Sequence, residues 1–283
     1  MLIQNIIPDF LTGYESNTDF KVSDIEAYIQ MYPEVFDHYF PNHCPRTEPR
    51  FQAAIVQYRD KIEDIRLISE RLPEIIEKIE TDFSTMFPGD FNLSYKLIVG
   101  TFGSNAFVSP DNRREIYFAT EKLSPKTDHL KVIVAHEIGH VAHFSFATNQ
   151  GMDWAAVDWL HGLTTLYVEG AATYLSKKVV PELKESVYFT YDDDGDSWVT
   201  CYEENKVQVK KRFLKDVLAG WDMRKEREWF RLGGGNYFGY NRLGYLLGTD
   251  YIEYLVRRIG EERALTFWKE NDLKEDIMLW LEK

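Results

Sequence analysis

Cysteine is nearly absent from this sequence, and so is any long apolar segment. The 283 residues include two cysteines, Cys44 and Cys201, which are far apart and lie in no CxxC pair. They cannot form a disulfide framework or a thiolate zinc site, so we expect free thiols in a reducing compartment. The apolar run at the N-terminus stops at Pro8, and no basic region precedes it. Because this is neither a signal peptide nor a membrane span, we predict a cytoplasmic protein without a membrane partner.

Positive charge is also scarce. The chain has 33 Lys and Arg against 46 Asp and Glu, a net charge of −13. Phosphate binding needs clustered Lys and Arg, so this balance excludes a nucleic-acid partner. Hydrophobic residues make up 44% of the chain, which is typical of a globular protein with a sizeable core. No feature of the sequence predicts an oligomeric state.

The order of the expected elements predicts an α+β fold. Residues 51–83 carry apolar side chains at helical spacing, with Pro73 expected to kink this helix or begin a second one. Residues 93–108 and 114–120 have the composition of strands, and helices are expected at about 128–147 and 164–180, with a mainly helical remainder. We therefore expect a helical region at 1–90, a catalytic core with a small, mostly antiparallel sheet at 91–181, and a helical C-terminal lobe at 182–283.

Two motif-like stretches predict no chemistry. If the glycine of "YDDDGDS" were the loop glycine of an EF-hand, Thr190 and Cys201 would occupy ligand positions that need carboxylates, so we expect an acidic surface turn. The stretch "RLGGGNYFGY" lacks the Gly-Lys-Ser/Thr of a phosphate-binding loop and indicates a flexible loop.

The stretch "VIVAHEIGHVAHF" places polar residues in an apolar helix. His136 and His140 are four residues apart, so both imidazoles project from one face of the helix and can share one ion. Glu137 lies about 100° further around the axis, where it can accept a proton from an attacking water. This HExxH pattern therefore predicts two zinc ligands and one general base.

A catalytic zinc needs a third protein ligand and one open position. The best candidate is Glu169 in "TLYVEGAATYLS", because a carboxylate on an otherwise apolar helix is unfavourable unless it is paired or bound to a metal. Its small neighbours Gly170 and Ala171 would let the two helices approach closely. Other candidates are His143, in the same helix as HExxH, and Asp153, Asp158 and His161, in the connection after that helix. His143 continues along the helix axis and is better explained by core packing.

The HEIGH motif, followed 29 residues later by the glutamate of "EGAA", resembles the gluzincin, or thermolysin-like, metallopeptidases. It resembles still more closely a bacterial family of predicted zinc-dependent proteases, in which a later Gly-Tyr-x-x-x-Gly segment recurs, here Gly239–Gly244. The resemblance covers residues 97–258 and implies a zincin-like fold, with His136, His140 and Glu169 holding one zinc ion per chain. It also implies that Asn105 and Ala106, 31 and 30 residues before His136, lie on an edge strand that pairs with an extended peptide.

These observations predict a zinc metallopeptidase acting on a peptide or protein substrate. Glu137 would serve as general base, and Tyr240, just beyond the glycine-rich stretch, would donate a hydrogen bond to the developing oxyanion, with His161 as the second candidate. Two alternatives remain: a catalytically silent relative that binds zinc and peptides as a chaperone or regulator, and a helical protein without a metal. The intact Glu137 favours the enzyme, because a scaffold does not need the base.

Overall fold

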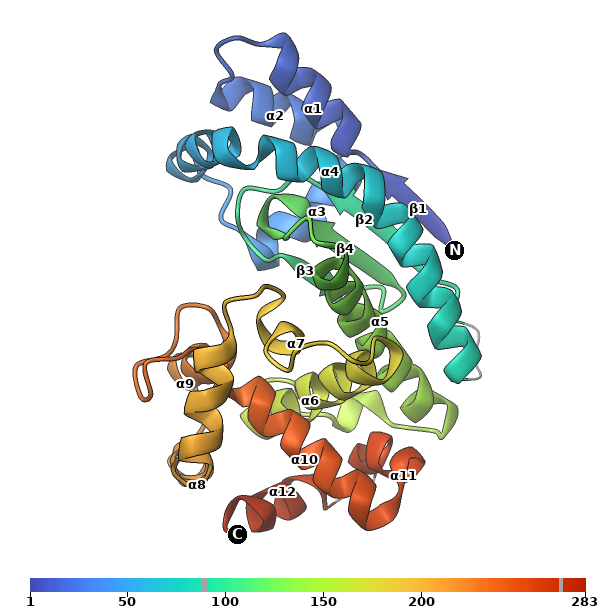
Figure 1. The fold of residues 1–283 in the computed structure, drawn as a ribbon, viewed down its shortest axis with the longest axis vertical. Coiled ribbons are helices and arrows are strands. Elements are labelled where there is room, and N and C mark those ends of the chain that lie inside the picture. The colour runs from blue at the N-terminus through green and yellow to red at the C-terminus, as the bar shows by residue number, and fades with distance from the viewer. Residues whose placement is uncertain (88–90, 270–271) are drawn as a thin grey trace. The chain divides into compact units, whose positions relative to one another are not determined.

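The computed structural model describes residues 1–87, 91–269 and 272–283. The fold is α+β, as the order of elements in the sequence predicts, and it is mostly helical with a small mixed sheet (Figure 1). The chain divides into two compact units, residues 1–137 and 138–283. The division falls within one continuous helix, α5 (Thr127–Asn149). The division into three parts at 90 and 181 stays a prediction, and residues 88–90 at its first boundary are outside the described residues.

The first unit contains the sheet and the helices around it. Its elements before α5 are β1 (Leu2–Asn5), α1 (Ile7–Ser16), α2 (Val22–Met31), α3 (Pro33–His43), α4 (Glu48–Met86), β2 (Ser94–Ile98), β3 (Ala106–Val108), β4 (Glu115–Ala119) and the 3-10 turn η1 (Thr120–Lys122). The strands β2, β3 and β4 lie where the β-branched and aromatic composition predicts them. The short strand β1 lies in a region that we expected to be helical.

The expectation of a mostly antiparallel sheet is wrong. The strand order is β1-β2-β4-β3, in which β1–β2 and β2–β4 are parallel and β3–β4 is antiparallel. Parallel neighbours need a long crossover, and α1 to α4 provide it between β1 and β2. Strand β3 can be antiparallel to β4 because only a short turn joins them, and it lies at the end of the sheet.

Helix α4 runs beside the sheet and extends without interruption through Pro73 (Figure 1). Its apolar positions, spaced by three and four residues, are buried, as the periodicity predicts. Hydrogen bonds also join it to the sheet: Tyr95 on β2 donates to Glu80 at 2.7 Å, and the side-chain amide of Asn5 on β1 donates to the carbonyl of Ser69 at 3.2 Å. The helix therefore fixes the position of β1 and β2 together.

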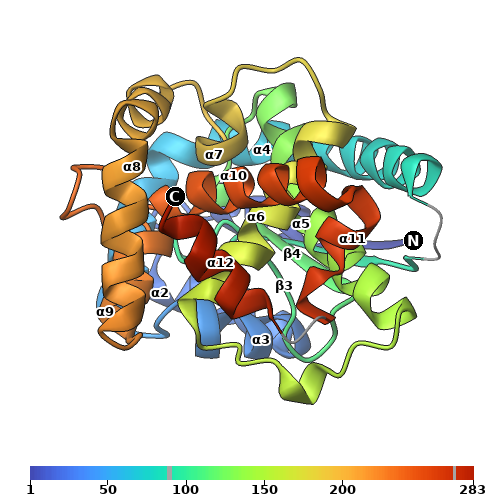
Figure 2. The ribbon, with the colours of Figure 1, turned by 90° about the horizontal axis from the view of Figure 1, so that it is seen from below.

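The second unit is helical. After the end of α5, its elements are η2 (Trp154–Ala156), α6 (Gly162–Val179), α7 (Val187–Thr190), α8 (Asp196–Leu218), α9 (Met223–Phe230), α10 (Leu243–Ile259), α11 (Glu261–Leu265), η3 (Phe267–Lys269) and α12 (Leu273–Leu281). Helix α6 lies in the middle of this unit, with α10 and α12 beside it (Figure 2). Its side chains Leu166, Tyr167 and Leu175 are fully buried, so α6 forms part of the core.

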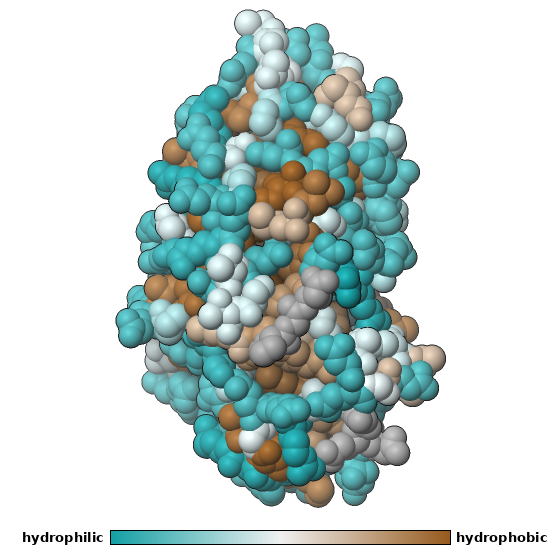
Figure 3. Space-filling model, turned by 90° about the vertical axis from the view of Figure 1, so that its right-hand side faces the viewer, coloured by the Kyte–Doolittle hydropathy of each residue, from teal (hydrophilic) through white to brown (hydrophobic). Residues whose placement is uncertain are grey.

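Hydrophilic residues cover most of the face in Figure 3, with hydrophobic residues between them. None of the helices in the described ranges combines the length and the apolar character that crossing a membrane requires. Both cysteines are free thiols, as their positions in the sequence predict.

Candidate metal centre

Helix α5 carries the HExxH motif through the interior of the protein. Residues 132–139 are all buried, with His136 2% and Glu137 7% exposed. A helix that is apolar on every side is expected to be buried on every side, and this explains the unbroken hydrophobic run around the motif. Polar side chains in such a helix need polar or charged partners.

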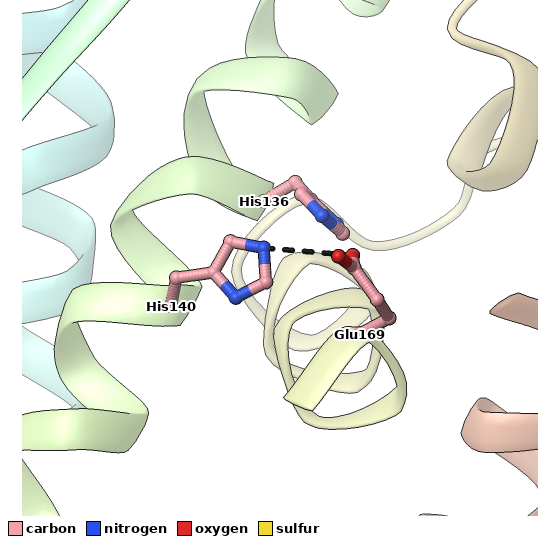
Figure 4. Close-up of side chains that lie close together, drawn as sticks. All are labelled: His136, His140 and Glu169. Atoms are coloured by element: carbon pink, nitrogen blue, oxygen red, sulfur yellow. Dashed lines mark ion pairs between the residues drawn. The ribbon is translucent and has the colours of Figure 1, made fainter. Parts of the chain in front are cut away.

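Three of the predicted ligands lie together. Among the described residues, His136, His140 and Glu169 form the one group of three or more His, Cys, Asp or Glu that could hold a metal ion, with ligand atoms within 4.8 Å of one another. Figure 4 shows both imidazoles directed toward the carboxylate of Glu169, which comes from the neighbouring helix α6. The distance from His140 Nε2 to Glu169 Oε2 is 3.5 Å.

This donor set fits zinc. With metal–ligand bonds of about 2.1 Å, a tetrahedral ion holds its ligand atoms about 3.4 Å apart, close to the His140–Glu169 distance. Two imidazoles and one carboxylate are also the donor set of a catalytic zinc site, in which a fourth position stays open. The geometry therefore suits a catalytic ion better than a closed, four-ligand structural one.

Small residues allow α5 and α6 to approach each other. Gly139 lies inside the motif, and a Cβ atom built on it would meet the backbone of Ala172 on α6, with the carbonyl oxygen at 3.0 Å. Ala172 is three residues after Glu169, so this contact adjoins the ligand. We expected Gly170 to serve this purpose, but a Cβ atom there would lie 2.3 Å from the backbone of Gly248 on α10. Gly170 therefore permits the crossing of α6 with α10.

Glu137 follows His136 on α5, so its side chain points about 100° away from the imidazole of that ligand. It is not one of the three residues of the metal group. The remaining candidate ligands have other partners. Asp158 accepts a hydrogen bond from Lys274 at 2.8 Å, which lowers the pKa of its carboxyl, and Asp153 accepts one from the amide of Ala155.

His161 caps the N-terminus of α6, where its Nδ1 accepts a hydrogen bond from the amide of Leu163 at 3.1 Å. Burial, followed by the charge of Lys274, lowers its pKa, so the ring is neutral near pH 7. This contact fixes the tautomer, because Nδ1 is the acceptor and Nε2 carries the proton.

His143 packs in an aromatic cluster. Its ring is fully buried and stacks on Trp268, with centroids 4.3 Å apart and planes 5° from parallel, and it meets the edge of Tyr167. Burial, with a smaller contribution from His140, lowers the pKa of His143 to about 3. The imidazole is therefore a neutral aromatic ring of the core, the role that its position along the helix axis predicts.

Tyr240 stacks on Trp198, with ring centroids 6.4 Å apart. The glycine-rich segment before it is held in place by the buried carboxylate of Glu228, which accepts hydrogen bonds from the amides of Asn236 at 3.1 Å and Tyr237 at 2.9 Å. These contacts restrain the segment that we expected to be flexible.

Tyr245 is a candidate that the sequence analysis missed. It lies on α10, three residues before Gly248, and therefore on the side of α10 that crosses α6 beside Glu169. Burial, and after it the charge of Glu169, raises the pKa of the Tyr245 phenol well above its ordinary value, so it is a neutral hydrogen-bond donor. Of the two glycines in "GYLLG", Gly248 lies at this crossing while Gly244 packs against the side chain of Phe230, so the sequence alone does not mark this tyrosine.

Asn105 and Ala106 lie at the start of β3, at the end of the sheet. The carbonyl of Asn105 accepts a hydrogen bond from the amide of Ala119 on β4 at 2.8 Å, and its side chain accepts one from the amide of Ala106. The loop before them is held by buried Glu121, whose carboxylate accepts hydrogen bonds from the amides of Gly100 and Phe102. The strand is thus fixed before any ligand arrives.

An HExxH helix, a carboxylate from a second helix and a small sheet define a chain with the parts of a metallopeptidase. A family model described as "Putative zinc dependent peptidase (DUF5700)" matches residues 14–273, and the chain belongs to this family. The match includes most of the N-terminal region, which the resemblance in the sequence did not cover. Searches of the curated proteins and of the solved structures gave no match.

Proposed function

We propose that the protein is a zinc metallopeptidase of the gluzincin type, which binds one zinc ion per chain through His136, His140 and Glu169. The observation that carries this proposal is the convergence of these three side chains from two helices, inside a chain of a zinc-dependent peptidase family. The antiparallel strand at the end of the sheet supports a zincin-like fold.

The zinc ion, when bound, would polarise the scissile carbonyl and lower the pKa of water toward neutrality. Glu137 would accept the proton of the attacking water and deliver it to the leaving amine. Its burial on α5, directly after the ligand His136, supports this role. His140 would be oriented by the crossing of α5 with α6.

A hydrogen-bond donor should stabilise the oxyanion as it develops. Tyr240 and His161 stay candidates from the sequence. The crossing of α10 with α6 beside Glu169 supports Tyr245 more strongly than either, because Tyr245 is one turn before Gly248, which packs against Gly170 next to Glu169.

The position of β3 supports a binding role for Asn105 and Ala106. A strand at the end of a sheet has one side on which an extended peptide can add its own backbone hydrogen bonds. In this proposal the backbone of β3 would bind the substrate strand, while the fixed loop before it keeps the entropic cost of binding low.

A digest of a peptide library by the zinc-loaded protein, read by mass spectrometry with and without a chelator, tests this function. We expect one zinc ion per chain and chelator-sensitive cleavage. Glu137→Gln should keep the zinc and lose at least 10²-fold in turnover, because the amide cannot accept the proton. Glu63→Gln, at an exposed position of α4, is the matched control.

Zinc bound at unit stoichiometry without any cleavage would favour the alternative, a silent zinc- and peptide-binding chaperone or regulator. A preparation that retains no zinc after incubation with zinc would contradict both the enzyme and the silent zinc-binding alternative.

A further inference from the structure

Arg242 is a buried cation that lies over the ring of Tyr245. It is the residue that precedes α10, has a left-handed backbone with φ of 53°, and is 9% exposed. Its guanidinium lies over the rings of Tyr245 at 4.9 Å, and of Tyr191 and Trp198 at 5.6 Å each. Aromatic faces attract a cation, but they do not neutralise its charge.

This arginine has no carboxylate partner among the described residues. Its one side-chain hydrogen bond goes to the carbonyl of Phe189, and its buried Nε has no acceptor. Other arginines of the same unit are paired, since Arg231 contacts Glu226 at 3.2 Å and Arg258 contacts Asp276 at 2.7 Å. Buried charges are normally paired, so a buried guanidinium without a counter-ion indicates an anion that is supplied from outside the chain.

The position of Arg242 indicates which anion this is. Arg242 and Tyr245 are three residues apart at the start of α10, and Gly248, one turn further, packs against Gly170 beside Glu169. The guanidinium therefore lies over the ring of a tyrosine that is one turn from the crossing of α10 with α6. In the peptidase proposed above, the group bound there would belong to the peptide substrate.

We propose that Arg242 binds a carboxylate of the peptide substrate, either its C-terminal carboxylate or an Asp or Glu side chain near the scissile bond. The proposal rests on the peptidase function proposed above. Guanidinium and carboxylate are complementary in charge and in planar geometry. Water competes less for the hydrogen bonds between them when the guanidinium is buried, as it is here. The ligand carboxylate supplies the missing counter-ion, so peptides that carry it at the right position bind more tightly than neutral ones.

Matched peptides test this directly on the zinc-loaded full chain. One pair has the same sequence with a free or an amidated C-terminus, and a second, amidated pair differs by Glu or Gln next to the scissile bond. We expect kcat/KM to favour the acid of one pair by about 10- to 100-fold, the scale of a charge-assisted contact. The pair that shows the preference identifies the source of the carboxylate.

Three variants assign that preference to Arg242. Arg242→Met should bring the acid-to-neutral ratio close to one, whereas Arg242→Lys should keep part of it. Arg257→Met removes the same charge from an exposed position of the same helix and should leave the ratio unchanged. A structural role for Arg242 would lower the cleavage of both peptides of a pair equally and preserve their ratio, and that result would overturn the proposal.

Binding measured in the Glu137→Gln background gives a readout that does not depend on turnover. With fluorescent versions of the same peptides, the acid should bind 10- to 100-fold more tightly, and Arg242→Met should remove the difference. A preference in binding without cleavage by the wild type would reject the peptidase function and retain the carboxylate site. Equal affinity for acid and neutral peptides in both pairs would reject the carboxylate site.

Discussion

The contact between Gly139 and Ala172 predicts that one methyl group can weaken the metal site without unfolding the protein. In Gly139→Ala the new Cβ atom would lie 3.0 Å from the carbonyl oxygen and 3.2 Å from the Cα atom of Ala172. Both neighbours are backbone atoms of a buried helix and cannot turn aside. To reach ordinary contact distances, α5 and α6 must separate by a few tenths of an ångström.

The fold can tolerate that separation, but it exceeds the variation in ligand distance that a zinc ion allows. Overpacking of a core costs about 1–3 kcal/mol, while alanine in place of a helical glycine contributes up to about 1 kcal/mol in the opposite direction. The net change in the free energy of unfolding is then at most about 2 kcal/mol. Zinc coordination distances tolerate only about ±0.2 Å, so displacing Glu169 from the two imidazoles should weaken zinc binding by 10-fold or more.

Competition with a fluorescent zinc chelator measures the affinity, and urea unfolding of the zinc-free protein measures the stability. Gly13→Ala on α1 is the matched control, because a Cβ atom there meets nothing within 4 Å. It should leave the zinc affinity unchanged and stabilise the chain by about 0.5–1 kcal/mol. If Gly139→Ala binds zinc as tightly as the wild type, the crossing of α5 with α6 does not set the ligand geometry and the reasoning fails.

Three further outcomes are expected. Glu169→Ala should lower zinc affinity by at least 10²-fold, since one of three ligands is lost; an unchanged affinity would transfer the third ligand to another residue. Tyr245→Phe should lower kcat about 10²-fold at constant zinc content, with Tyr240→Phe close to the wild type, and the opposite order would return the oxyanion role to Tyr240. His143 has a folded pKa of about 3, below its unfolded value of about 6.5, so the unfolded chain takes up the proton first and stability falls as the pH drops below 6.5. With chelator present, His143→Phe should remove about 2 kcal/mol of the loss between pH 7 and pH 5 in urea titrations.

The part of the site that the sequence could predict consists of residues whose roles follow from their local sequence. The spacing of His136 and His140 predicts their common direction because four residues make about one helical turn. Glu169 could be proposed from a local conflict, a carboxylate on an apolar helix. Arg242 and Tyr245 could not, because the place of Tyr245 depends on the crossing of α6 with α10, a contact between segments more than seventy residues apart, and Arg242 lies over the ring of Tyr245.

The same limit applies to the sheet. The strands β2, β3 and β4 could be predicted from composition, but their directions depend on which strands become neighbours. The four residues of β1 show no strand-like alternation, and their pairing with β2 depends on the intervening α1 to α4. Local composition therefore predicted three of the four strands, but it could not predict the parallel pairings.

Two helix crossings made with small residues hold α6 near Glu169. Gly139 of α5 packs against Ala172, three residues after Glu169, and Gly248 of α10 packs against Gly170, the residue after Glu169. Such contacts leave no room for the backbones to adjust, so the position of the Glu169 backbone is fixed by helix packing. The carboxylate is also close enough to buried Glu226 for its charge to help raise the pKa of that residue, after the larger effect of burial. Rigid packing thus keeps a negative charge where burial and a second carboxylate both disfavour it. A cation bound by Glu169 and the two imidazoles offsets that cost, which gives a physical reason for this group of residues to bind a metal ion and not only to fill the core.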